Sequence, residues 1–237
     1  MPPAKVTGSA TDYREIDRWT DGVGWIAHPE EIMRRASHAL RTDEGVWIVD
    51  PVDAAGVEEL IAEFGEVAGI VILSNQHRRD ADVFADRYNV PVFLPAPMED
   101  VAAELDAPIE WIEPGDQLGE YELIEVAIST VLGADWFEYS LYDGETLLVG
   151  ESLGTAPYLR VDDERLGVML LRRLDPPRDT LGDLTPERVL GGHGAGVQED
   201  AAAALEDALT NSRRHFPRAL VENGLSQLRT VLAAIRT

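Results

Sequence analysis

Two histidines in this sequence lie where side chains often perform chemistry. His77 belongs to the segment SNQHRRD (74–80), which directly follows an apolar run typical of a buried strand. His193 lies in the segment GGHG, where small neighbours let the backbone turn sharply and hold an imidazole apart from other side chains. An imidazole at either position could serve as a metal ligand or a general base. Surface or packing roles are assigned to His28, His38 and His215.

The elements that must position His77 form an alternating pattern. Apolar residues at helical spacing predict a helix after Asp53, which is expected to cap it, and a second helix over 81–88, which Asn89 ends. Short β-branched runs at 46–49, 68–73 and 91–94 predict strands around these helices. The β-α-β-α-β order predicts a partly parallel sheet covered by helices, in which sites lie at the carboxyl ends of the strands.

The second half of the chain has a different pattern of predicted elements. Strands are predicted at 122–128, 137–142 and 146–149, with Asp143-Gly144 as a hairpin turn, and a short strand at 189–190 leads to His193. A helix is predicted over 162–174. Two apolar stripes, at 201–209 and 221–235, predict helices whose expected role is core packing, with a partner-binding surface as the alternative.

The order of these segments resembles the metallo-beta-lactamase fold. The matching segments are GVWIVD (45–50), IVILSNQHRRD (70–80), VPVFLP (90–95), LLVGE (147–151) and RVLGGHG (188–194). The resemblance implies an α/β protein, an αββα sandwich of the metallo-beta-lactamase type. We expect one domain spanning 1–237, with the small and polar residues 1–12 frayed. In that family, residues of these segments hold two metal ions, usually zinc, which activate water for hydrolysis.

Carried over one position at a time, most of the family's metal ligands are replaced in this chain. The loop histidines fall on Asn75 and His77, and the aspartate and the histidine beside it fall on Arg79 and Asp80. A third histidine would lie near Ala134 and is absent. The bridging aspartate becomes Glu151, and the last histidine is His193. The pocket implied by the resemblance comprises Asn75, His77, Arg79, Asp80, Glu151 and His193.

Arg79 is the most informative replacement, because it places a permanent positive charge where a cation would sit. One hypothesis is that its guanidinium replaces the metal electrostatically and pairs with Glu151 or Asp80. The alternative is that Arg78 and Arg79 form only the solvated start of a helix.

The replacements favour a degenerate member of the fold that lacks the two-metal hydrolase site and acts as a binding or structural protein. No cofactor and no catalytic residue is expected in that case. One alternative is a hydrolase that keeps one weakly held zinc or other divalent metal through His77, Asp80, Glu151 and His193, and cleaves a small ester, thioester or phosphoester. Another is a metal-free enzyme that uses His77 or His193 as general base.

The composition indicates the partners and the solvent environment that the protein is suited to. The 237 residues include 44 acidic and 20 basic ones, a formal charge of −24, and Lys5 is the one lysine. This charge argues against nucleic-acid and membrane partners and leaves a small molecule or a protein, with a homodimer as an open alternative. Acidity spread along the chain predicts a halophilic, cytoplasmic protein. Because there is no cysteine, any metal must be held by histidine and carboxylate.

Overall fold

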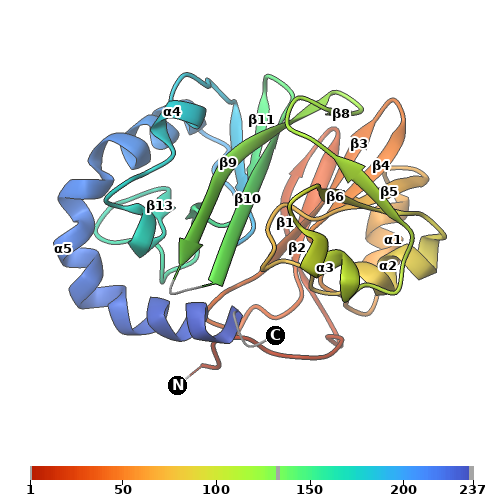
Figure 1. Ribbon diagram of the computed structural model, residues 1–237, viewed down its shortest axis with the longest axis horizontal. Coiled ribbons are helices and arrows are strands. Elements are labelled where there is room, and N and C mark those ends of the chain that lie inside the picture. Colours follow the sequence, from red (N-terminus) through yellow and green to blue (C-terminus); the bar gives the residue numbers. More distant parts are fainter. Residues whose placement is uncertain (1, 132–133, 235–237) are drawn as a thin grey trace.

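The computed structural model describes residues 2–131 and 134–234, and two β-sheets form its centre (Figure 1). The seven-stranded sheet runs in the order β1 (Arg14–Trp19), β2 (Gly22–Ile26), β3 (Ala36–Thr42), β4 (Gly45–Val49), β5 (Val67–Val71), β6 (Val92–Pro95) and β7 (Ile109–Ile112). The five-stranded sheet runs in the order β14 (Arg188–Gly191), β11 (Thr146–Val149), β10 (Ala134–Tyr142), β9 (Tyr121–Val131) and β8 (Gln117–Leu118). A short pair is formed by β12 (Leu153–Gly154) and β13 (Gly167–Val168).

Helices lie outside the two sheets. The first sheet carries α1 (Val57–Ala62), α2 (Ala81–Tyr88) and α3 (Glu99–Ala103), and the second is flanked by α4 (Arg178–Leu181) and the long α5 (Ala201–Ala234) (Figure 1). A single 3₁₀ turn, η1, spans Leu170–Arg172. This layered arrangement confirms the predicted α/β sandwich.

The predicted β-α-β-α-β run is present. Strands β4, β5, β6 and β7 pair in parallel, whereas β1 to β4 form antiparallel pairs. Helix α2 has the predicted bounds, and Asn89 ends it with a left-handed backbone (φ 53°). Asp53 does not cap α1, because that helix begins only after Gly56, which has φ 86°.

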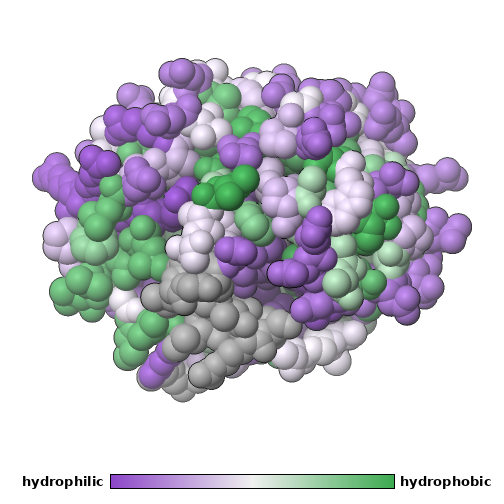
Figure 2. All heavy atoms as spheres, in the orientation of Figure 1, coloured by the Kyte–Doolittle hydropathy of each residue, from purple (hydrophilic) through white to green (hydrophobic). Residues whose placement is uncertain are grey.

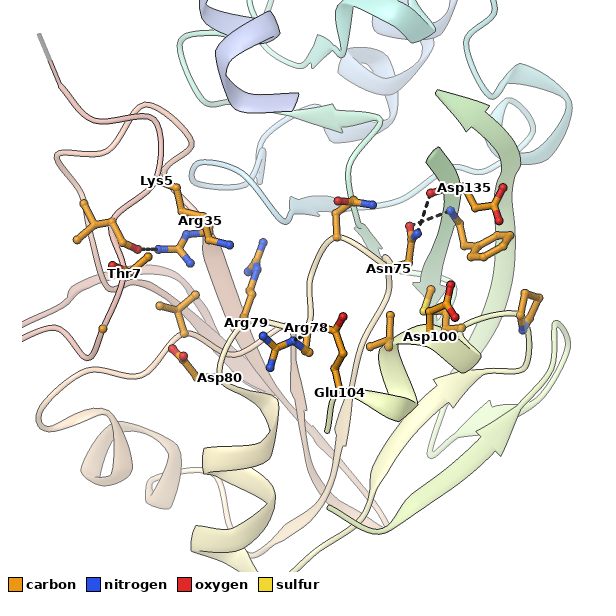
Figure 3. A pocket seen from close by; sticks show the side chains of 18 residues that line it. Lys5, Thr7, Arg35, Asn75, Arg78, Arg79, Asp80, Asp100, Glu104 and Asp135 are labelled. Atoms are coloured by element: carbon orange, nitrogen blue, oxygen red, sulfur yellow. Dashed lines mark hydrogen bonds and ion pairs between the residues drawn. The ribbon is translucent and has the colours of Figure 1, made fainter. Parts of the chain in front are cut away.

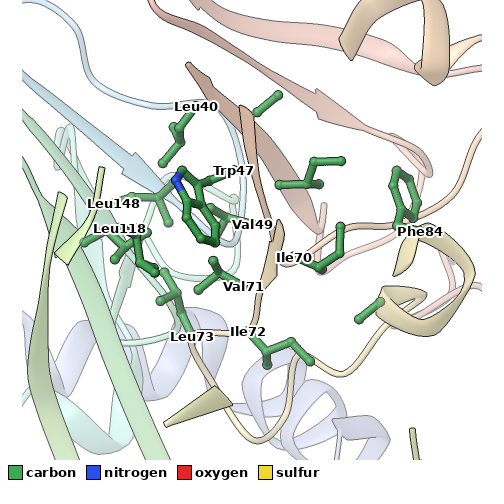
Figure 4. Close-up of a cluster of buried hydrophobic side chains, with 14 of the residues drawn as sticks. Leu40, Trp47, Val49, Ile70, Val71, Ile72, Leu73, Phe84, Leu118 and Leu148 are labelled. Carbon is green, nitrogen blue, oxygen red and sulfur yellow. The ribbon is translucent and has the colours of Figure 1, made fainter. Parts of the chain in front are cut away.

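Strand β5 is buried on both faces, which explains its unbroken apolar sequence. Figure 4 shows Val71 and the following Leu73 directed toward Leu148 of the second sheet, while Ile70 lies on the side of Phe84 from α2. Burial between two layers fixes the end of this strand and therefore the start of the 74–80 loop.

The helix predicted over 162–174 is wrong. The segment instead holds β13 and η1, and Asp162 has a left-handed backbone (φ 53°) that does not continue a helix. The buried Arg173 forms an ion pair with Glu164 at 2.6 Å, and Glu164 also accepts the backbone N–H of Val161. These contacts close the segment into a compact loop.

The two apolar stripes lie on one continuous helix, α5, but have different environments. Ala201, Ala204, Leu205 and Leu209 are buried in the core as predicted. Val221 is 85% exposed and Leu225 63% exposed, so the prediction of core packing is wrong for the described part of the second stripe. The stripe positions 232 and 235 lie outside the side chains that the structure describes. Figure 2 shows apolar side chains gathered on this face of α5. The homodimer stays a prediction. None of the described helices is long and apolar enough to cross a membrane.

The N-terminal segment, expected to be frayed, is hydrogen-bonded to the body of the protein. The carbonyls of Pro3 and Ala4 accept the N–H groups of Ile32 and Met33, and Ala10 donates to the Asp53 carbonyl. We call residues 3–10 the N-terminal strap. The strap carries Lys5 across the end of the first sheet.

Candidate functional site

Five charged or titratable side chains meet where strands of both sheets end. Asp50 follows β4, and His77 and Arg79 lie in the loop after β5. Glu151 follows β11, and His193 follows β14. We call these five residues the buried cluster. The cluster lies at the carboxyl ends of its strands, as the α/β pattern predicts.

Short contacts join the cluster. His77 Nδ1 lies 2.7 Å from Asp50 Oδ2, and His77 Nε2 lies 2.7 Å from Glu151 Oε1. His193 Nε2 lies 3.4 Å from Glu151 Oε2 and 3.3 Å from His77 Nε2, while its Nδ1 is held by the Met33 carbonyl at 2.9 Å. The side chains of His77, Glu151 and His193 are exposed by 2%, 6% and 0%, so the cluster is almost closed to solvent.

Burial and opposite charge work against each other in the cluster. Burial and Arg79 oppose protonation of His77, but Asp50 and Glu151 raise the pKa of its imidazole above the usual value. Burial likewise opposes ionisation of Asp50 and Glu151, yet the nearby histidines hold the pKa of both carboxyls below their usual range. When His77 is protonated, the positive charges of His77 and Arg79 balance the negative charges of Asp50 and Glu151.

Arg79 is anchored by backbone carbonyls from three strand ends. Its Nη1 donates to the carbonyls of Ala36 at 2.5 Å and Asp50 at 2.7 Å, and its Nη2 donates to Gly192 at 3.0 Å. Nη2 also lies 3.1 Å from His77 Nε2. Burial lowers the pKa of the guanidinium.

The predicted pairing of Arg79 with Glu151 or Asp80 is therefore not the arrangement that anchors it. Within the described ranges, neither carboxylate forms an ion pair with this guanidinium. The interpretation of Arg79 as a solvated helix start also fails, because its donors are turned inward to carbonyls. Arg79 and Asp50 both have left-handed backbones, with φ 47° and 49°. Such conformations are uncommon for non-glycine residues and concentrate at functional sites.

Two of the predicted pocket residues lie outside the buried cluster. The Asn75 amide donates to the Asp135 carbonyl at 2.8 Å and accepts the Phe137 N–H at 3.0 Å, which ties the loop to β10. Asp80 accepts the Asp53 N–H at 2.8 Å. The position expected for a third histidine adjoins residues 132 and 133, which the structure does not describe.

The sequence reasoning missed three residues of this site. Asp50 orients His77, and its place at the carboxyl end of a predicted strand was an available signal. Glu138 accepts the N–H groups of Glu151 and Ser152 at 2.9 and 2.6 Å and fixes the end of β11. Tyr158 packs its ring 5.9 Å from that of His193, a contact that no local pattern indicates.

The donor set suits one divalent cation and not two. His77, Glu151 and His193 are the one group of potential ligands that the described residues bring together, with ligand atoms within 4.8 Å of one another. Each imidazole has its Nδ1 fixed from outside, which is the usual arrangement for metal-binding histidines. Glu151 Oε1 has no hydrogen-bond partner among the described residues, so its 2.7 Å contact with His77 is an ion pair without hydrogen-bond alignment. The guanidinium of Arg79 lies against the same set.

The two facing sheets, their outer helices and a site at the strand ends define a metallo-beta-lactamase fold. Solved structures with the same fold include a metallo-beta-lactamase from Pontibacter korlensis, at 15% identity and a TM-score of 0.55 over 84% of this chain and 100% of that one. A metallo-beta-lactamase from Hirschia baltica matches at 10% identity and a TM-score of 0.57, over 84% and 97% of the two chains. The DIM-1 metallo-beta-lactamase matches at 9% identity and a TM-score of 0.54, over 86% and 99%.

No family model matches the sequence, and no curated protein matches it either. The similarity is therefore one of fold. The predicted resemblance to the metallo-beta-lactamase fold is confirmed at that level.

Proposed function

We propose that this protein is a degenerate metallo-beta-lactamase-fold protein that lacks the two-metal hydrolase site and works as a metal-free binding protein. Arg79 is the residue on which the proposal rests. Three carbonyls hold its guanidinium beside His77 Nε2, so a metal ion could bind this nitrogen only if the contact between Arg79 and His77 broke. The cluster also balances its charges without a metal when His77 is protonated.

The position of a neighbouring pocket supports the binding role in this proposal. A pocket of about 540 Å³ opens beside the 74–80 loop and is lined by Asn75, Arg79 and Asp80 together with the N-terminal strap (Figure 3). We call it the Arg79 pocket. His77, Glu151 and His193 are not among the described residues that line it. A ligand in this pocket would contact Arg79, and the histidines would lie behind it.

The hydrolase with a single metal is the second candidate, and the convergence of three donors supports it. His77 Nε2, His193 Nε2 and Glu151 would hold the ion, and Asp80 would not take part because it is engaged with Asp53. A zinc bound there would supply a Lewis acid that lowers the pKa of a water molecule. Arg79 would then have to leave His77.

Elemental analysis of the protein, purified without added metal, separates these functions. We expect well under one zinc, manganese or iron per chain, and an unfolding temperature that does not change with chelator. About one tightly held metal per chain, with a lower unfolding temperature in chelator, would overturn the proposed function in favour of the second candidate.

A further inference from the structure

We propose that the Arg79 pocket binds a small molecule with an anionic group, a phosphate or a carboxylate, on an apolar body. The anionic group would lie among Lys5, Arg35 and Arg79. This inference rests on the proposed function, because it treats Arg79 as a permanent wall of the pocket.

Positive charge is concentrated on one side of this pocket in a protein of net charge −24. The one lysine of the chain lines it, together with Arg35, Arg78 and Arg79 (Figure 3). Burial and then Arg35 and Arg79 lower the pKa of Lys5 to about 8. Burial and the neighbouring guanidiniums therefore both disfavour the charge of Lys5, and an anion bound there would offset the repulsion from Arg35 and Arg79.

Three carboxylates near the basic side of the pocket are held by contacts of their own. Glu31 binds Arg35 at 2.8 Å and also accepts the backbone N–H of Val6. Glu104 binds Arg78 at 3.2 Å, and Asp80 accepts a backbone N–H. Within the described residues, the guanidinium of Arg79 contacts carbonyls and His77, and its buried Nε has no hydrogen-bond partner. The Nε–H of Arg79 is therefore the donor that remains for a ligand, although the charge of the guanidinium also helps to balance the buried cluster.

The strap makes this side of the pocket rigid. Glu31 accepts the backbone N–H of Val6, and Arg35 donates to the Val6 carbonyl at 2.6 Å. The buried Glu31–Arg35 pair therefore holds both backbone polar groups of Val6, the residue next to Lys5. A binding group that is already ordered loses little entropy when a ligand arrives.

The remaining walls determine what the anion is attached to. Val52, Met98 and Phe137 contribute apolar surface, while Asp100 and Asp135 lie on the side away from Lys5 (Figure 3). These two carboxylates repel an anion, so they favour an orientation with the charged end at Lys5. The volume suits a ligand larger than a bare phosphate ion.

Calorimetric titration tests the inference with charged and neutral probes of the same body. Phenyl phosphate and hexanoate are compared with phenol and 1-hexanol in 1 M KCl, where exposed charges are largely screened and enclosed ones less so. We expect the anions to bind at least about tenfold more tightly than the neutral probes. The anion with the larger gain in affinity over its own neutral counterpart identifies the preferred group. Equal affinity for charged and neutral probes, or no binding of any probe, would overturn the inference.

Variants locate the binding. Lys5→Gln should raise the Kd for the preferred anion by about tenfold, and Lys5→Arg should restore it. Arg41→Gln is the matched control, because Arg41 forms an exposed pair with Asp21 elsewhere on the surface. An unchanged Kd in Lys5→Gln would contradict the inference. The metal content of the same sample separates the two proposals: bound metal with Lys5-dependent binding refutes only the proposed function, and absent metal without anion binding refutes only this inference.

Discussion

The Nη2 atom of Arg79 lies 3.1 Å from Nε2 of His77, the one ring nitrogen of that histidine that Asp50 does not hold. A metal ion bound by His77 would need this nitrogen, and Arg79 brings a fixed positive charge to it. In this chain the guanidinium and the metal are therefore alternatives.

Replacing Arg79 should destabilise the protein. Arg79→Gln leaves Asp50 and Glu151 buried with His77 as the one remaining cation, which should lower the free energy of unfolding by about 3–5 kcal/mol. Urea unfolding measures the change. Arg41→Gln is the control, since the exposed Arg41–Asp21 pair should contribute less than about 1 kcal/mol. Equal effects of the two substitutions would show that Arg79 does not balance the buried cluster.

A methyl group at Gly192 should disturb the site through packing. A Cβ atom there would lie 2.7 Å from Cε1 of His77 and even closer to the Gly150 carbonyl, so Gly192→Ala should lower the free energy of unfolding by about 1–3 kcal/mol. Gly224→Ala, within α5, should instead be neutral or stabilising by up to about 1 kcal/mol, because its surroundings leave room for a methyl group. A harmless Gly192→Ala would mean that His77 is not held as tightly as its contacts indicate.

The affinity of the Arg79 pocket for an anion should depend on pH through Lys5. The lowered pKa of about 8, caused first by burial and then by Arg35 and Arg79, means that Lys5 is charged below pH 8 and neutral above it. Arg78 also lowers the pKa of Lys5, whereas Glu31 raises it. The Kd for the preferred anionic probe should therefore rise between about pH 7 and pH 9. In Lys5→Gln the profile should be flat across this range, and a profile that keeps the wild-type slope would assign the titration to another group.

Salt should stabilise the fold if the composition reflects a halophilic setting. With 44 acidic and 20 basic residues, repulsion among surface carboxylates opposes folding in dilute buffer. At 1 M salt the screening length falls to about 3 Å, so the free energy of unfolding should increase strongly from dilute buffer to molar KCl. Equal stability in both solutions would refute the halophilic interpretation.

Local patterns were sufficient for much of the fold. The spacing of Ala81, Phe84 and Tyr88 predicted α2 with its observed bounds, and the apolar run at 68–73 predicted β5. The helix predicted over 162–174 failed because the ion pair between Glu164 and Arg173 determines that segment, and such a pair has no periodic signature.

The site was predictable only in part, because its decisive contacts join distant segments. The resemblance brought His77, Glu151 and His193 to one place, and the structure places them together. The partners of Arg79 are carbonyls that follow or begin other strands, and main-chain acceptors leave no mark in a sequence. Lys5 was assigned to a frayed end because its small and polar neighbours do not reveal the hydrogen bonds of the strap.

Anomalous scattering at the zinc edge, from crystals of the wild-type protein soaked in zinc, tests the central claim most directly. The metal-free account predicts no anomalous peak between His77, Glu151 and His193, and electron density for the Arg79 guanidinium beside His77. A strong peak bonded to both Nε2 atoms and to Glu151, with Arg79 displaced, would contradict the account.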